Sequence, residues 1–134
     1  MEDQEKQEVM RIAQDYFMQE LGDKAKAEDA LGKLATMVKS DGAKLVHLGN
    51  TLFLTVVRGK GLVEVHTMGK ESPRKMVKNL NDLGKYLKRI GVKTAYSYSD
   101  SGSPLVKLAK RALPVKEKKA NIAGKEVDVL VMEL

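Results

Sequence analysis

Apolar residues recur every three or four positions in the first third of the chain and at alternate positions in the middle. Residues 5–21 and 23–39 both have the spacing of an amphipathic helix. Residues 44–48 and 51–57 alternate instead and flank Gly49-Asn50, a strong signal for a two-residue β-hairpin. We therefore expect a connected pair of helices, with a bend near their junction, followed by a sheet.

The alternation continues through residues 62–67, which predict a third strand after the turn Arg58-Gly-Lys-Gly61. Ser72-Pro73 then combines a helix-capping side chain with a proline at the first helical position, so a helix is expected over 73–90. Residues 51–57 are apolar at nearly every position, which is typical of a strand covered on both faces. The middle of the chain thus predicts a β-meander that feeds an amphipathic helix.

The last third repeats the change of period. It predicts, in order, a strand over 92–99, a turn at 100–104, a helix over 104–113, a strand over 115–122, a turn at Ala123-Gly124 and a strand over 126–134. The element order ααβββαβαββ predicts an α/β (α+β) fold, with a mixed, mainly antiparallel sheet and helices on both faces. We expect one domain over 1–134, made of a helix pair (1–42), a β-meander (43–67) and a βαβαββ-type remainder (68–134).

Composition removes several classes of function. The chain has no cysteine, which excludes disulfides and thiolate chemistry, and no apolar run near the roughly 20 residues that span a bilayer. Residues 1–31 carry nine acidic and four basic side chains, whereas residues 32–134 carry nine acidic and twenty basic ones. The acidic start lacks the pattern of a signal peptide, so we expect a cytoplasmic protein, or one in a virion assembled there, without membrane insertion.

The element order resembles the GNAT (Gcn5-related N-acetyltransferase) superfamily over about residues 5–134, lacking that fold's short first strand. The resemblance implies an acetyl-CoA site at the loop that opens the helix after residues 62–67, through a motif Arg/Gln-x-x-Gly-x-Gly/Ala. Here that loop reads Met68-Gly-Lys-Glu-Ser-Pro-Arg-Lys75. It has Gly69 alone, Glu71 at its mouth, and Pro73, which has no N–H to donate.

A second departure lies in the helix over 104–113, where the family commonly places a tyrosine as general acid. The matching stretch Lys107-Leu-Ala-Lys-Arg-Ala-Leu113 has leucine or alanine instead. In size, lysine richness and missing motif the chain resembles small GNAT-like virion-associated proteins of tailed bacteriophages. That resemblance implies a non-catalytic binding or assembly module without a cofactor, a structural or accessory protein docking on protein partners through charged surfaces. Self-association is compatible with this role.

Two alternatives remain open. An active N-acetyltransferase with a non-standard loop would use Gly69, Ser72, Arg74 and Lys75 to hold acetyl-CoA, and Glu64 or His66 as the general base. A nucleic-acid-binding module would use the cations of the helix over 73–90, namely Lys75, Lys78, Lys85, Lys88 and Arg89. Dispersed lysines of this kind are also typical of an ordinary solvated surface.

Two pairs of side chains are each two residues apart in a predicted strand, so the members of each pair share one face of that strand. Glu64 and His66 lie two residues apart, a pattern typical of a solvent-facing polar pair as well as of a catalytic one. Tyr96 and Tyr98 lie likewise and favour a sheet–helix interface over the stacking of nucleic-acid bases. The two histidines lack the short spacing of zinc ligands, so no metal site is expected.

Overall fold

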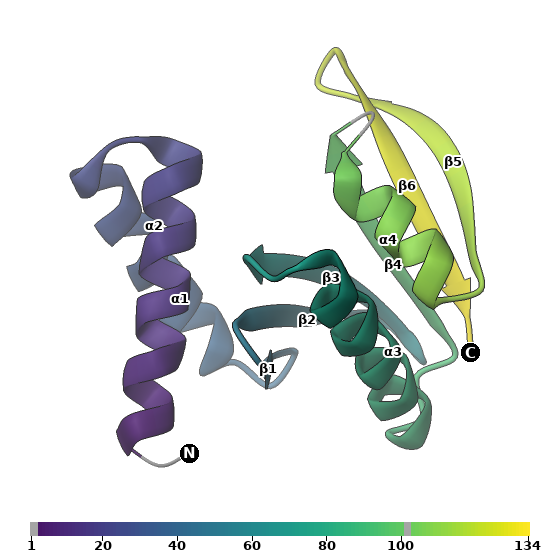
Figure 1. Cartoon of the computed structure of the whole chain (residues 1–134), viewed down its shortest axis with the longest axis horizontal. Coiled ribbons are helices and arrows are strands. Elements are labelled where there is room, and N and C mark those ends of the chain that lie inside the picture. Colours follow the sequence, from purple (N-terminus) through teal and green to yellow (C-terminus); the bar gives the residue numbers. More distant parts are fainter. Residues whose placement is uncertain (1–2, 101–102) are drawn as a thin grey trace.

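A computed structural model describes residues 3–100 and 103–134 of the chain. The elements in chain order are α1 (Asp3–Leu21), α2 (Lys24–Val38), β1 (Ala43–Leu48), β2 (Thr51–Gly59), β3 (Leu62–Gly69), α3 (Pro73–Arg89), β4 (Thr94–Asp100), α4 (Pro104–Ala112), β5 (Val115–Ile122) and β6 (Lys125–Glu133) (Figure 1). This order is the one that the hydrophobic pattern predicts.

The helix ends follow from local capping chemistry. Gly22, at a φ of +65°, stops α1, and its N–H donates to the carbonyl of Met18 over 2.9 Å. Asp23 then caps α2 by accepting the backbone N–H of Lys26 over 3.1 Å. The predicted helix pair with a break between its members is confirmed.

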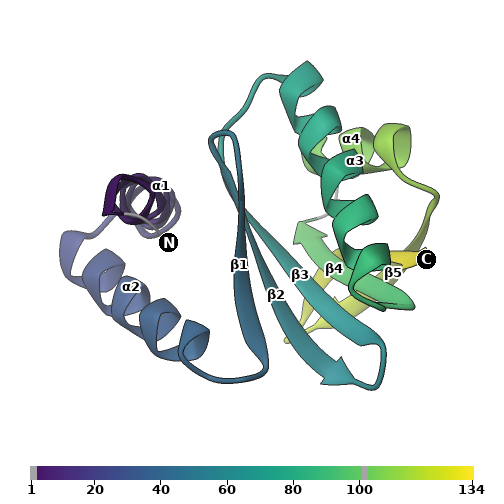
Figure 2. The ribbon, with the colours of Figure 1, turned by 90° about the horizontal axis from the view of Figure 1, so that it is seen from below.

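The described residues form a six-stranded sheet in the order β1-β2-β3-β4-β6-β5. Neighbouring strands are antiparallel except β3 and β4, which are parallel because α3 connects them. Helices α1 and α2 lie on one side of the sheet, and α3 and α4 on the other (Figure 2). The predicted fold class, a mixed and mainly antiparallel sheet with helices on both faces, is confirmed.

Two hydrophobic clusters hold the layers together. The cluster under α3 and α4 centres on Leu83 and Leu87, and the cluster under α1 and α2 centres on Ile12. Strand β2 contributes to both, because Phe53 points into the first cluster and Leu52 into the second. Every residue from 51 to 56 is buried, which confirms the prediction of a strand covered on both faces except at Val57, which is exposed.

The last third departs from the prediction at the start of β4. Strand β4 begins at Thr94 rather than at Val92, whose side chain is buried in the cluster under α3 and α4. Before β4, the carbonyl of Gly61 accepts the N–H groups of both Lys93 and Thr94, which aligns the start of β4 with β3. The turn predicted at 100–104 lies partly outside the described residues.

Among the described helices, none combines the length and the apolar character needed to cross a membrane.

Candidate functional site

Strands β3 and β4 are paired only at their first residues. Residues 62–64 of β3 pair with residues 94–96 of β4, yet β3 continues to Gly69 and β4 to Asp100. Beyond this short ladder the two strands diverge in a V (Figure 1). Their facing edges there do not pair with each other, so backbone N–H and C=O groups are available to a ligand in the opening.

The opening is a cleft of about 780 Å³, within the usual size of a small-molecule site. Five elements and two loops contribute to its wall: α1, β3, α3, β4, α4, and the loops at 70–71 and at 103. The lining residues are Tyr16, Gln19, Glu20, His66, Thr67, Gly69, Lys70, Glu71, Met76, Ser97, Tyr98, Ser99, Asp100, Ser103, Pro104, Leu105 and Leu108. The cleft therefore combines an apolar floor from α3 and α4 with polar groups from α1 and β4.

Glu64 occupies the point where the two strands separate, and it is only 8% exposed. Its carboxylate accepts hydrogen bonds from the hydroxyl of Tyr96 over 3.0 Å and from Nε of Arg58 over 3.3 Å. A third bond joins it to Nε2 of His66. The interpretation of Glu64 and His66 as a solvent-facing pair is thus wrong for Glu64, because donors from three separate positions enclose its carboxylate.

The hydrogen bonds determine how these groups ionise. Burial acts to raise the pKa of the Glu64 carboxyl, but the bonds from Arg58, Tyr96 and His66 outweigh it, and the net pKa lies below the ordinary 4.5. The hydrogen bond to Glu64 likewise raises the pKa of Arg58. Burial and the bond to Glu64 raise the pKa of Tyr96. Glu64 is therefore an ionised carboxylate at neutral pH, and Tyr96 stays a donor.

His66 follows Glu64 on the same face of β3 and lines the cleft. Since an ionised carboxylate only accepts hydrogen bonds, the Nε2 that meets Glu64 carries a proton. In the neutral ring Nδ1 then holds a lone pair, and no other described residue hydrogen-bonds to His66. A histidine oriented by a buried carboxylate beside an open cleft can accept a proton from a bound nucleophile.

Packing against neighbouring residues determines the conformation of the loop at 68–75. Gly69 has a φ of +106°, and a Cβ there would lie 2.4 Å from the carbonyl oxygen of Asn50. Ser72 caps α3 by accepting the N–H of Lys75 over 3.4 Å, and the Arg74 and Lys75 side chains are exposed. Of the four residues that the sequence offers for a cofactor, Gly69 lines the cleft, whereas Ser72, Arg74 and Lys75 do not.

Glu71 turns toward the β1–β2 hairpin, where its carboxylate accepts the backbone N–H of Asn50. The Asn50 side chain donates to the carbonyl of Lys70 over 2.9 Å and accepts from Nη2 of Arg11 over 2.7 Å. These bonds fix the loop against both the hairpin and α1. They leave Lys70 as a cationic side chain in the wall of the cleft.

Sequence reasoning missed Lys70 and the wall that α1 contributes. Tyr16, Glu20 and Asp100 meet there, and burial followed by these two carboxylates raises the pKa of the Tyr16 hydroxyl. Tyr16 and Asp100 lie 84 positions apart in the sequence, so no local pattern relates them. Their meeting follows from α1 lying across the sheet at the end of β3.

The second tyrosine of β4 also differs from its prediction. Tyr98 is 43% exposed and meets Tyr96 edge to face, with ring centroids 5.6 Å apart. It lies on the same face of the sheet as Glu64 of β3, a face that neither α3 nor α4 covers. The prediction of a tyrosine pair inside a sheet–helix interface is therefore wrong for Tyr98, which lines the cleft instead.

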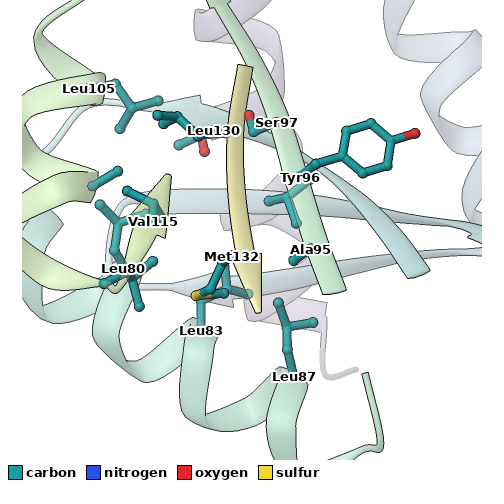
Figure 3. A pocket seen from close by; sticks show the side chains of 14 residues that line it. Leu80, Leu83, Leu87, Ala95, Tyr96, Ser97, Leu105, Val115, Leu130 and Met132 are labelled. Atoms are coloured by element: carbon teal, nitrogen blue, oxygen red, sulfur yellow. The ribbon is translucent and has the colours of Figure 1, made fainter. Parts of the chain in front are cut away.

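The opposite side of β4 holds a small apolar cavity of about 60 Å³ under α3 and α4 (Figure 3). Leu80, Leu83 and Leu105 line it, together with Leu130 and Met132 of β6. Figure 3 shows the ring of Tyr96 pointing away from this cavity, toward the other side of β4. The two faces of β4 thus differ, because one completes a dry core and the other borders the polar cleft.

The remaining candidate residues lie elsewhere. Lys75, Lys78, Lys85, Lys88 and Arg89 are exposed on α3, and none of them lines the cleft. Within 3–100 and 103–134, no three histidine, aspartate or glutamate side chains gather in a way that suits a metal ion.

Comparison with known proteins gives a consistent answer at the level of the fold. No protein-family profile matches the sequence, and no curated protein is significantly similar to it. Among solved structures, it superposes on an assigned phosphinothricin N-acetyltransferase with a TM-score of 0.68 and 14% identity, over 96% of this chain and 93% of that one. It also superposes on a mutant of the spermidine N-acetyltransferase SpeG from Vibrio cholerae, with a TM-score of 0.61 and 12% identity. That superposition covers 80% of this chain and 75% of the SpeG chain.

A third similar structure is a Bacillus subtilis acetyltransferase in complex with CoA, with a TM-score of 0.56 and 9% identity, over 76% of this chain and 83% of that one. Identities this low establish shape rather than activity. The superpositions cover at least three quarters of this chain and support the predicted fold class. The chain therefore has a GNAT-like fold.

Proposed function

We propose that this chain is an acyl-CoA-dependent N-acyltransferase that works in the cleft between β3 and β4. The observation that carries the proposal is the His66–Glu64 pair, placed where the two strands separate and beside an open cleft. The three similar structures described above are acetyltransferases, and one of these three is bound to CoA, which supports this class of donor over others.

The cleft suits the extended, amide-bearing arm of an acyl-CoA. Residues 65–69 and 97–100 offer strand edges that do not pair with each other, and such edges hydrogen-bond extended ligands. Lys70 supplies a positive charge in the wall, while the Glu71 carboxylate is occupied by the N–H of Asn50. When bound, an acyl-CoA would supply an activated acyl thioester.

The chain's own residues supply the proton chemistry. An acceptor amine must lose protons to become acylated, and His66, which lines the cleft, can take one on Nδ1 because Nε2 is bonded to Glu64. Glu64 then faces the charged imidazole ring, and Arg58 and Tyr96 hold that carboxylate in place. Tyr16 remains protonated because its pKa is raised, so its hydroxyl is an available donor in the cleft.

Calorimetric titration with acetyl-CoA tests the donor, and release of free thiol with a panel of primary amines tests the reaction. We expect saturable binding, and we expect His66→Ala to lower the rate about 10²- to 10⁴-fold, the usual contribution of a general base. His47→Ala is the matched control, because His47 lies on β1 and does not line the cleft. Absence of both heat and thermal shift at millimolar acetyl-CoA would dispose of the proposal.

The loop favours a second candidate, a non-catalytic binding or assembly module. Pro73 has no N–H to donate to a phosphate, and Glu71 adds a carboxylate to the lining of the cleft. Such a module would copurify with protein partners in a larger assembly and would leave acetyl-CoA unbound. Recovery of the chain only as a free monomer, together with acetyl-CoA binding, would reject it in favour of the enzyme.

A further inference from the structure

The outer surface of α3 and α4 is strongly basic. Together the two helices carry nine basic side chains and one acidic one, Asp82. The cations are Arg74, Lys75, Lys78, Lys85, Lys88, Arg89, Lys107, Lys110 and Arg111, and all are exposed. By contrast, α1 and α2 carry seven acidic and five basic side chains.

Folding makes these cations into one surface. Both helices lie on the same side of the sheet and pack against each other (Figure 2). Gly84 permits the close approach, because a Cβ at that position would lie 2.9 Å from Cδ2 of Leu113 at the end of α4. We call the exposed side of the two helices, defined by the nine cations above, the basic face.

Most of this charge is not neutralised by the residues that the structure describes. Lys78 pairs with Asp82 and Lys110 pairs with Glu117. The other seven cations form no ion pair with any residue in the described part of the chain. A surface with seven unpaired cations and no excess of nearby carboxylates attracts a polyanion.

The character of the basic face selects among polyanions. A membrane-binding helix needs an apolar side to insert, but the apolar side of α3, including Leu80, Leu83 and Leu87, is buried in the core. A protein interface is centred on aromatic and apolar anchors and is depleted in lysine. Single-stranded nucleic acid needs exposed rings for stacking, whereas Tyr86 is half-buried and lies beneath Arg89. What remains is recognition of repeated phosphates without base contacts.

The dimensions agree with a duplex. From Arg74 to Arg89 the helix α3 extends about 22 Å, and duplex DNA presents about one phosphate charge per 1.7 Å of its axis. We propose that the basic face binds the phosphate backbone of double-stranded nucleic acid without sequence preference. This function is separate from the cleft, which lies between β3 and β4 and is lined by none of the nine cations.

Fluorescence anisotropy with a labelled duplex DNA of about 24 base pairs, about 80 Å long, tests the proposal. We expect binding that falls about 10²- to 10³-fold between about 50 and 200 mM salt, as required when four or five phosphates are neutralised. Absence of binding at the lower salt, or an affinity that does not change with salt, would overturn it.

The variant K85E/K88E/K107E should lose at least tenfold in affinity at low salt, because it reverses three charges on the basic face. The matched control K24E/K26E/K39E changes net charge equally, at exposed positions on or beside α2. Circular dichroism tests whether both variants fold. If K85E/K88E/K107E does not fold, K85Q/K88Q/K107Q replaces it. Equal losses of affinity in both variants would mean that binding depends on net charge alone, and would reject the basic face as the binding site. Equally strong binding of phosphatidylserine vesicles would reject the choice of a duplex.

Discussion

The two helical layers of this protein differ in how completely they cover the two faces of the sheet. Helices α3 and α4 cover a continuous core in which Leu87 is completely buried, and they keep their charges outside. Helices α1 and α2 bury less, since Ala27 and Leu34 are the buried residues of α2. They cover β1, β2 and β3 on this face of the sheet. They do not cover β4, which borders the cleft.

This difference indicates which face of a small sheet can hold a binding cleft. The fully covered face holds the larger hydrophobic cluster, and the partly covered face leaves polar side chains of β3 and β4 in contact with solvent. Glu64 and His66 lie on that second face, at the boundary of the cover given by α1. Three comparisons of variants test this contrast.

The largest effect is expected from Leu87→Ala in the layer of α3 and α4. Leu87 is 0% exposed, and its truncation leaves a cavity, so unfolding free energy should fall by about 4 kcal/mol. Leu34→Ala in α2, where Leu34 is 7% exposed, should cost about 2 kcal/mol. Urea unfolding of both variants measures the difference. Equal costs would mean that the two layers are equally well packed.

Gly69→Ala should have the next largest effect, because it strains the contact between the loop at 68–75, the hairpin and α1. A Cβ would meet the carbonyl oxygen of Asn50 at 2.4 Å and Cγ2 of Ile12 at 3.1 Å, at a φ of +106°. The expected loss is about 2–3 kcal/mol by thermal or urea unfolding.

The control for that loss is Gly22→Ala, at a φ of +65° with no atom within 4 Å of the new Cβ. It carries only the backbone penalty, about 1 kcal/mol. A loss at Gly69 no greater than at Gly22 would show that the hairpin and α1 yield to the added methyl group.

The smallest effect is expected from Glu64→Gln, which keeps the shape of the side chain and removes its charge. At neutral pH the variant should lose about 2 kcal/mol, since bonds to a charged acceptor become bonds to a neutral amide. The folded pKa of Glu64 lies below its ordinary 4.5, so its contribution is present above that pH and is lost as pH falls through the folded pKa.

The difference in stability between wild type and Glu64→Gln should therefore shrink as pH falls from about 7 to about 3.5. Urea unfolding across this range measures it. A difference that stays constant with pH would mean that the Glu64 charge contributes nothing and that the amide alone accounts for the loss.

Sequence pattern was a good guide to the elements and a poor guide to the site. Ser72-Pro73 marks the start of α3, and Gly49-Asn50 marks the first hairpin, because caps and turns depend on neighbours in the chain. The same reasoning singled out Glu64 and His66 but gave no reason for Glu64 to be buried. It placed Tyr98 under a helix, since alternation shows that a strand has two faces without showing which face is covered.

The sequence by itself determined the order of helices and strands and the absence of thiol chemistry, since these depend on the spacing and type of neighbouring residues. Only the tertiary structure decided that β3 and β4 separate after three paired residues and that Arg58, Tyr96 and His66 converge on Glu64. It also joined the cations of α3 and α4 into one face. Such contacts join residues that are distant in the chain, and their energies appear only when the sheet and its two layers assemble.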